Sequence, residues 1–176
     1  MKTKLIFLFC TIISLSNSYI WSQCTPPSSD NCEDANVLCS LDEVNGYSCK
    51  NTDYSNPTGC IPLCPSGGTP QNTGWWAFVT NGGSVCITVT FSNCSVNGTG
   101  VQFGVWEDCD CGVSIFCDPN CGGPGTKMLC GVLKPCKTYY LFVDGCSGDV
   151  CDFTLTTSGG GAPMLPPLGN IMGPTN

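Results

Sequence analysis

The stretch SVCITVTF, residues Ser84–Phe91, alternates strictly between two kinds of side chain. Val85, Ile87, Val89 and Phe91 occupy every second position, and serine, cysteine and threonine occupy the others. Because successive side chains of a strand point to opposite faces, this period of two predicts a β-strand with one face in a hydrophobic core. The stretch therefore favours a protein built from sheets.

Similar strand patterns lie on both sides of this stretch. Trp75–Val79 precedes it as an aromatic strand, and the Asn81-Gly82 pair between the two is typical of a β-hairpin turn. Downstream, alternating or apolar segments predict five more strands, at 101–106, 113–116, 127–133, 138–143 and 152–157. The Asp144-Gly145 pair is the expected turn before the last of them. Short strands joined by glycine, asparagine and proline turns predict an all-β sandwich.

The remaining segments are less regular. Residues 30–41, DNCEDANVLCSL, predict a short strand or a helical turn, and no segment predicts a convincing long helix. Residues 45–73 contain four prolines and a Gly-Gly pair, so we expect a long loop that needs cysteines to hold it in place. From residue 158 the chain is rich in glycine and proline and has no cysteine, which predicts a linker or tail over residues 158–176.

The first residues have the layout of a secretory signal peptide. Two lysines precede an apolar run, Leu5–Leu15, and small residues follow it. The run is about half of the roughly 20 residues that a membrane-spanning helix needs, so we expect no membrane insertion. Cleavage between Ser18 and Gln23 is expected, which makes residues 1–22 a signal peptide. The mature chain is then secreted to the extracellular space or held at the cell surface.

Cysteine is unusually frequent in this chain. One of its 17 cysteines, Cys10, lies in the leader, which leaves an even set of sixteen. Such a set in an exported chain predicts a framework of up to eight disulfides. Zinc and redox sites are weaker alternatives, because the chain lacks the Cys-x2-Cys pairs and the histidines that zinc sites usually use. The disulfide candidates are Cys24, Cys32, Cys39, Cys49, Cys60, Cys64, Cys86, Cys94, Cys109, Cys111, Cys117, Cys121, Cys130, Cys136, Cys146 and Cys151.

Sequence spacing leaves the pairing of these cysteines open. Cys146 with Cys151, and Cys130 with Cys136, are plausible pairs because each flanks a short segment. Cys109 and its neighbour two residues on, Cys111, are expected to seek different partners. Sixteen cysteines are more than stability requires in a domain large enough to have a core, which indicates a harsh, protease-rich setting.

Charge and missing residue types exclude several functions. All 13 acidic residues follow the leader, whereas only four lysines do, so the mature formal charge is −9. With no basic patch, nucleic acid and anionic membrane are excluded as expected partners. Because histidine and arginine are absent, a Ser-His-Asp triad, a Cys-His dyad, a HExxH zinc site and arginine clamps are excluded too. A carboxylate pair stays open in principle, but none of the three glutamates lies in a recognisable motif, so we expect no enzyme.

Several short motifs recur in a familiar order. They are DNCEDA at 30–35, GWWAF at 74–78, GVW at 104–106 and TYYLFVDGCSGDVCDF at 138–153. In this order they resemble the bacterial pre-peptidase C-terminal type domain, most of all the version near the start of large surface proteins of gliding, type-IX-secreting bacteria. The resemblance spans roughly residues 30–157. It implies a jelly-roll-like sandwich and a non-catalytic accessory module that binds carbohydrate or protein, or that helps secretion and adhesion.

Two sets of side chains are candidates for a binding site. Acidic residues cluster in two regions, and convergent loops there could supply the six to eight oxygens that calcium needs, although no EF-hand pattern is present; ordinary turn chemistry is the alternative. The calcium candidates are Asp108, Asp110 and Asp118 in one cluster, and Asp144, Asp149 and Asp152 in the other. The candidates for a sugar-stacking platform are the aromatic residues Trp75, Trp76, Trp106, Tyr139 and Tyr140.

The platform hypothesis depends on exposure. In an alternating strand one residue of each adjacent pair points outward, so one of Trp75 and Trp76, and one of Tyr139 and Tyr140, is expected at the surface. Core packing is the competing explanation, and an exposed aromatic patch would indicate a binding face.

Together these patterns predict a disulfide-rich β-sandwich over residues 24–157 that works as an extracellular or cell-surface binding and adhesion module. Its expected partner is a glycan or a protein, and its only expected cofactor is structural calcium, if any. Two alternatives stay open: a structural subunit of an extracellular filament or sheath that self-assembles, and a carboxylate- or metal-dependent hydrolase.

Overall fold

The computed structural model describes residues 28–51 and 60–160. The predicted signal peptide, the disulfide candidate Cys24 and residues 161–176 of the predicted tail lie outside these ranges. Nine strands and two short 3-10 helices make up the described chain: β1 (Val37–Leu38), η1 (Leu41–Val44), β2 (Ser48–Lys50), β3 (Gly74–Val79), β4 (Gly83–Ser92), β5 (Val101–Trp106), β6 (Ser114–Asp118), β7 (Gly125–Leu133), β8 (Thr138–Gly145), η2 (Cys146–Gly148) and β9 (Asp152–Ser158).

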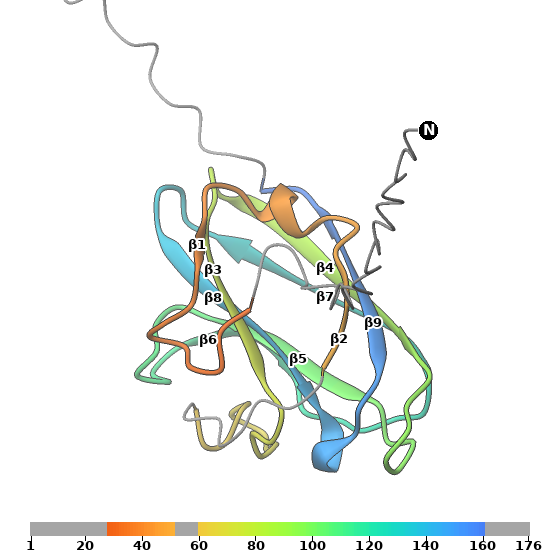
Figure 1. The fold of residues 1–176 in the computed structure, drawn as a ribbon. Coiled ribbons are helices and arrows are strands. Elements are labelled where there is room, and N and C mark those ends of the chain that lie inside the picture. Colours follow the sequence, from red (N-terminus) through yellow and green to blue (C-terminus); the bar gives the residue numbers. More distant parts are fainter. Residues whose placement is uncertain (1–27, 52–59, 161–176) are drawn as a thin grey trace, which may run out of the picture.

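The strands form two sheets that pack face to face (Figure 1). One sheet has five strands in the order β1-β3-β8-β5-β6, and the other has four in the order β2-β9-β4-β7. Apart from β1, which joins the edge of its sheet by parallel pairing with β3, the strand order is that of a jelly roll. The predicted all-β, jelly-roll-like sandwich is confirmed.

The alternating stretch that predicted a strand behaves as expected. It forms most of β4, and Val85, Ile87, Val89 and Phe91 are buried between the sheets. They pack against inward-facing residues of the opposite sheet, such as Phe103. The other positions of β4 face outward and are partly or fully exposed.

Two predicted turns are wrong. Strand β3 pairs with β1 and β8, whereas β4 pairs with β7 and β9, so the Asn81-Gly82 segment crosses from one sheet to the other and makes no hairpin. The Asp144-Gly145 pair does not turn either, because β8 continues through both residues in register with β5. Both errors arise because local turn signals do not show which sheet the next strand joins.

Six disulfides link the described residues. They join Cys32–Cys109, Cys60–Cys111, Cys64–Cys117, Cys86–Cys130, Cys94–Cys151 and Cys121–Cys146. Cys49 is disulfide-bonded as well. The predicted disulfide framework is confirmed in these bonds, and Cys109 and Cys111 have different partners as expected.

Other expectations about the cysteines are wrong. Cys146 does not pair with Cys151, nor Cys130 with Cys136, because the partners of Cys130, Cys146 and Cys151 come from other strands and loops. Cys39 and Cys136 form no disulfide and are exposed. These two of the described cysteines therefore take no part in the internal disulfide framework.

Neither short helix in the described ranges is long and apolar enough to cross a lipid bilayer.

Candidate functional site

The aromatic platform predicted from sequence is mostly buried. Trp75 and Tyr139 are fully buried, and Trp76 and Trp106 are only 1% and 3% exposed. The expectation that one of Trp75 and Trp76 reaches the surface is therefore wrong. Of the five candidates, only Tyr140 is partly exposed. A sugar cannot stack on the other four without displacing the residues that cover them.

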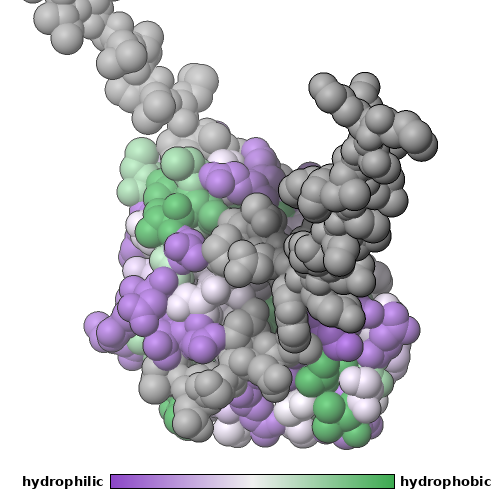
Figure 2. Space-filling model, viewed as in Figure 1, coloured by the Kyte–Doolittle hydropathy of each residue, from purple (hydrophilic) through white to green (hydrophobic). Residues whose placement is uncertain are grey.

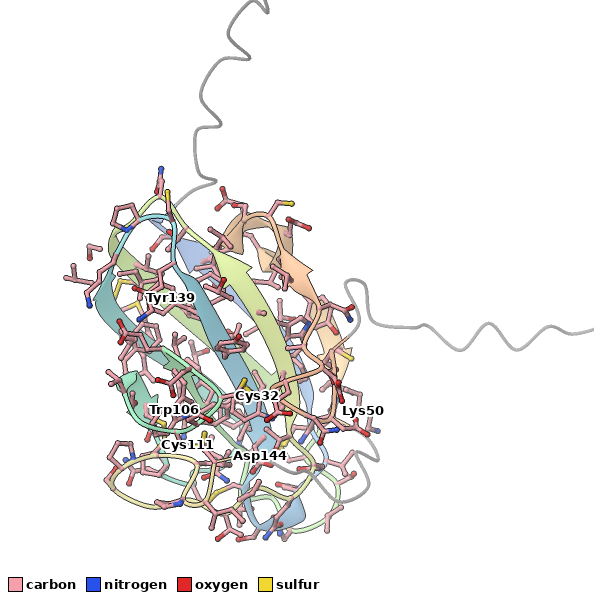
Figure 3. All side chains as sticks on the ribbon, turned by 90° about the vertical axis from the view of Figure 1, so that its left-hand side faces the viewer. Cys32, Lys50, Trp106, Cys111, Tyr139 and Asp144 are labelled. Atoms are coloured by element: carbon pink, nitrogen blue, oxygen red, sulfur yellow. A yellow bond between two sulfur atoms is a disulfide. The ribbon has the colours of Figure 1, made fainter. Side chains whose placement is uncertain are left out.

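The reason is a second apolar layer outside the five-stranded sheet. Trp75, Trp106 and Phe142 lie on its outer face and form a cluster with Cys32 and Leu63. In Figure 3, Cys32, Trp106 and Cys111 lie together on this face. The Leu63 carbonyl also accepts a hydrogen bond from Trp106 Nε1 at 3.0 Å. Strands of this sheet are thus buried on both sides, which the period-two argument does not anticipate.

Disulfides hold this outer layer in place. Three bridges join the N-terminal segment and the loop before β3 to residues on or beyond β5 and β6: Cys32–Cys109, Cys60–Cys111 and Cys64–Cys117. The loop expected to need cysteines is therefore a cover over the sheet. In the stretch 60–73 it carries almost no regular hydrogen-bonded structure, so these covalent links replace a ladder.

The first acidic cluster forms local turns and ion pairs. Asp118 accepts hydrogen bonds from Asn120 and forms an ion pair with Lys127 at 3.2 Å. Asp108 accepts a hydrogen bond from the backbone N–H of Gly112 at 3.1 Å. Burial raises the pKa of Asp118, but the Asn120 N–H and the Lys127 ammonium outweigh it and leave the pKa below the usual range. Asp110 is exposed. This is the turn chemistry named as the alternative to calcium.

Asp149, in the second cluster, is fully buried among hydrogen-bond donors. Its carboxylate accepts from the backbone N–H groups of Val96, Asn97, Gly100 and Val150, at 2.9 to 3.2 Å. Burial raises the pKa of this carboxyl, but the four N–H donors outweigh it and hold the pKa below the usual range. Asp149 therefore anchors the loop between β4 and β5.

Asp144 is buried in a similar setting at the end of β8. It accepts from the backbone N–H groups of Gln71 and Asn72, from Thr73 Oγ1 at 2.7 Å, and from Gln102 Nε2 at 2.5 Å. Here burial is the largest effect and raises the pKa, and the hydrogen bonds offset it only in part. Asp144 thereby ties the cover loop to the end of the sheet.

Calcium at these positions stays a prediction. A cation needs oxygen ligands, and the groups that face Asp144 and Asp149 are N–H and O–H donors, which would have to turn away first. Asp152 accepts a hydrogen bond from Asn93 Nδ2 at 2.8 Å. Within residues 28–51 and 60–160, one group of three side chains of the types that bind metals lies close together: Cys94, Asp149 and Cys151. Its two cysteines are joined by a disulfide, so they offer no thiolate to a metal.

A cavity opens among the loops beside Asp144. Its volume is about 240 Å³. Gln102 of β5 lines it together with three loop segments: the loop before β3, the start of the β6–β7 connection and the turn after β8. The three loop segments lie at the lower end of Figure 1. We call this end of the sandwich the cavity end. The lining residues are Gly68, Thr69, Gln71, Gln102, Pro119, Cys121, Cys146 and Ser147.

Gln102 connects the cavity to the buried Asp144. Its Nε2 donates to Asp144 Oδ2 at 2.5 Å and to the Thr69 carbonyl at 3.1 Å, so two acceptors fix the orientation of the amide. Its Oε1 is buried and has no hydrogen-bond partner in the described ranges. Gly68 lies against this oxygen at a φ of +88°, and a Cβ there would come within 2.6 Å of it. Glycine is therefore required at this wall.

The lining is polar but uncharged. Thr69, Ser147 and Gln71 offer hydroxyl and amide groups, and Cys121 and Cys146 share a disulfide, so no lining side chain ionises near neutral pH. Such a surface suits a neutral ligand with several hydroxyl groups better than a charged one. Sequence reasoning missed these residues. The available signal was Gln102, a polar residue in the otherwise apolar strand VQFGVW.

Comparison with solved structures finds a distant match. The pre-peptidase C-terminal domain of collagenase from Bacillus anthracis matches 71% of this chain and 95% of its own length, at 16% sequence identity and a TM-score of 0.39. No family model matches the chain, and no curated protein sequence matches it.

Proposed function

We propose that this protein is an extracellular, non-catalytic binding module that holds a neutral, hydroxylated ligand, such as the end of a carbohydrate chain, in the cavity. The observation that carries the proposal is the lining: neutral hydroxyl and amide groups on loops that disulfides and buried carboxylates brace. The six disulfides support the extracellular part of the proposal, because disulfides persist in oxidising compartments and are rare in a reducing cytosol.

The size of the cavity supports a small binding epitope. At about 240 Å³ it is below the roughly 300 Å³ at which pockets for drug-sized molecules begin. It therefore suits one terminal unit of a longer ligand. A single such contact binds weakly, which is common for modules that act in several copies on one surface.

Binding is favoured over hydrolysis by the position of the carboxylates. Asp144 is connected to the cavity by its hydrogen bond with Gln102. Its carboxylate is fully buried and accepts hydrogen bonds from four donors. Hydrolysis of a glycoside needs two carboxyl groups that reach the scissile bond from opposite sides. The cavity lining provides none.

A glycan array followed by calorimetry with the best glycan tests the proposal. In the T69A/S147A double variant, loss of two neutral hydrogen bonds, each contributing about 1 kcal/mol, is expected to weaken binding at least tenfold. The matched control is S84A/T156A, which removes two exposed hydroxyl groups from β4 and β9 of the four-stranded sheet, outside the cavity lining. It should leave the affinity unchanged. Absence of glycan binding, or equal affinity in both double variants, would contradict the proposal.

A further inference from the structure

Cys39 and Cys136 are the two cysteines of the described ranges that form no disulfide, and both are exposed. Every other cysteine there is bonded. Exposed thiols in an oxidising space do not stay reduced, and a leftover cysteine in a secreted chain indicates pairing with another molecule. The location of the two thiols shows which molecule fits.

Both thiols lie at the same end of the sandwich. Cys39 directly follows β1, whose last residue, Leu38, pairs with Phe78 of β3. Cys136 precedes β8 on the other side of β3, and its backbone N–H donates to the Thr80 carbonyl at 2.9 Å. We call this the thiol end; it is the upper end of Figure 1, opposite the cavity end.

An internal bridge between these two cysteines does not fit the fold. They flank β3 on opposite sides, so two strand spacings of about 4.8 Å each separate their backbones. A disulfide requires Cα atoms within about 7 Å. The backbone of Cys39 is also constrained, because Ser40 begins η1 with a capping box: its Oγ accepts from Asp42, and its N–H donates to Glu43.

A hydrophobic patch adjoins the two thiols. Val37 is 64% exposed and pairs with Ala77, which in turn pairs with the partly exposed Tyr140. Val79, one position beyond Phe78, is also partly exposed. Figure 2 shows hydrophobic side chains gathered at the upper left, over β1 and the adjoining ends of β3 and β8. A cluster of this kind beside two thiols is suited to contact with another protein.

Charged residues border the patch. Glu107 pairs with Lys137 at 2.8 Å and with Lys134 at 3.3 Å, and both lysines are substantially exposed. The arrangement of an apolar centre, two thiols and a charged rim with both signs is that of a small protein interface. Lys134 and Lys137 flank Cys136, whereas exposed Asp42 and Glu43 follow Cys39. Opposite charges therefore face each other when Cys39 of one copy meets Cys136 of another.

We propose that the thiol end binds a second copy of this chain about a two-fold axis, with Cys39 of each copy bonded to Cys136 of the other. In a two-fold interface, residue i of one copy meets residue j of the other, and the reverse holds as well, so two unlike thiols on one surface give two identical bridges. The cavities at the opposite ends stay free, and the dimer presents two of them.

The bonds form by thiol–disulfide exchange with a disulfide oxidant such as oxidised glutathione. A thiolate of one copy attacks the oxidant and forms a mixed disulfide while one glutathione thiol leaves. The facing thiolate then attacks the protein sulfur of that mixed disulfide and releases the second glutathione thiol. For each bridge, two protein thiols are oxidised and one glutathione disulfide is reduced to two thiols.

Non-reducing electrophoresis and intact mass after incubation of the purified chain with oxidised glutathione test this pairing. The wild type should give a covalent dimer with two bridges and no alkylatable thiol. C39S and C136S alone should each stay monomeric, because each lacks one side of the pair. An equal mixture of the two variants should give a mixed dimer with one bridge. C39S/C136S is the monomeric control, and circular dichroism melting checks that all variants fold.

Four results would overturn the proposal. A wild-type monomer with neither an alkylatable thiol nor a glutathione adduct in its intact mass would mean an internal bridge between Cys39 and Cys136. A monomer that carries glutathione adducts would mean that no facing thiol is in reach. A wild-type monomer that alkylates at both cysteines would mean that no interface forms. Dimers of a single variant equal in yield to the wild type would mean that like cysteines pair. None of these results depends on the ligand of the cavity, so failure here leaves the proposed binding function untouched.

Discussion

At the scale of single residues, buried carboxylates organise the loops of the cavity end. Asp149 gathers three backbone N–H groups from the loop before β5 and that of its neighbour Val150, and Asp144 gathers donors from the loop before β3. Asn72 links the two, because its N–H donates to Asp144 and its side chain to the Asp149 carbonyl. A buried charge is tolerated here because hydrogen bonds satisfy it.

D149N tests the anchoring role of Asp149. The amide would turn an NH₂ group toward backbone N–H donors and lose charge-assisted hydrogen bonds, so we expect the free energy of unfolding to fall by about 3 kcal/mol. Urea unfolding measures this value. The control is D110N, an exposed carboxylate, for which the change should stay within about 0.5 kcal/mol. Equal stabilities of the two variants would contradict the anchoring role.

The raised pKa of Asp144 predicts how the stability of the protein depends on pH. This pKa is raised by burial above the ordinary value of 3.8, so between 3.8 and the raised pKa the folded state binds more protons than the unfolded state. Stability from this group therefore falls as pH rises through that window. We expect the difference in unfolding free energy between wild type and D144N to decrease as pH rises above 3.8 and then to level off.

Urea unfolding of both proteins over a pH series measures this difference, and the comparison cancels the other titrating groups. A difference that is constant with pH, or that grows as pH rises, would show that burial does not raise the pKa of Asp144.

At the scale of elements, strands of the two sheets follow different rules. Strand β4 has one buried face and alternates in sequence, whereas β3, with the sequence GWWAFV, is buried on both faces and does not alternate. A continuous apolar run is the pattern of a strand covered on both sides. Read in that way, adjacent tryptophans indicate a covered strand and not an exposed platform.

Removal of one bridge from the cover tests this reading. The C64S/C117S variant removes the bridge between two cysteines that lie 53 residues apart in sequence. The control variant C86S/C130S removes a bridge between cysteines that lie 44 residues apart. Loop entropy makes each worth about 4 kcal/mol, so both variants should lose similar stability. Only C64S/C117S should release the cover from Trp106, which contacts Leu63.

Quenching of tryptophan fluorescence by acrylamide in the folded state measures this release. We expect greater quenching in C64S/C117S than in the wild type, and wild-type quenching in C86S/C130S. Equal quenching in the two variants would mean that the bridge does not hold the cover over the outer face.

At the scale of the whole molecule, the sandwich separates two kinds of surface. The cavity end carries the loops that buried carboxylates and the Cys121–Cys146 bridge brace, and the thiol end carries Cys39, Cys136 and the hydrophobic patch. The jelly-roll connections cross between sheets at each end and so place the loops there. This separation allows one end to bind a ligand while the other binds a second copy.

Sequence by itself determined the fold class, most strand positions and the disulfide strategy. These follow from local signals: the period of two in β4, the other short apolar segments and an even set of cysteines after the leader. The excluded chemistries also follow from composition, because a missing histidine or arginine is absent in any fold.

Tertiary structure alone decided the remaining features. Which cysteines pair, which sheet each strand joins and which aromatic residues are covered all depend on contacts between residues far apart in the chain. Trp106 is buried because a loop more than forty residues away in sequence is bonded over it, with Trp106 Nε1 donating to Leu63 at a separation of 43. Likewise, Thr69, Gln102 and Ser147 meet at one cavity only because two connections and strand β5 converge at one end of the sandwich.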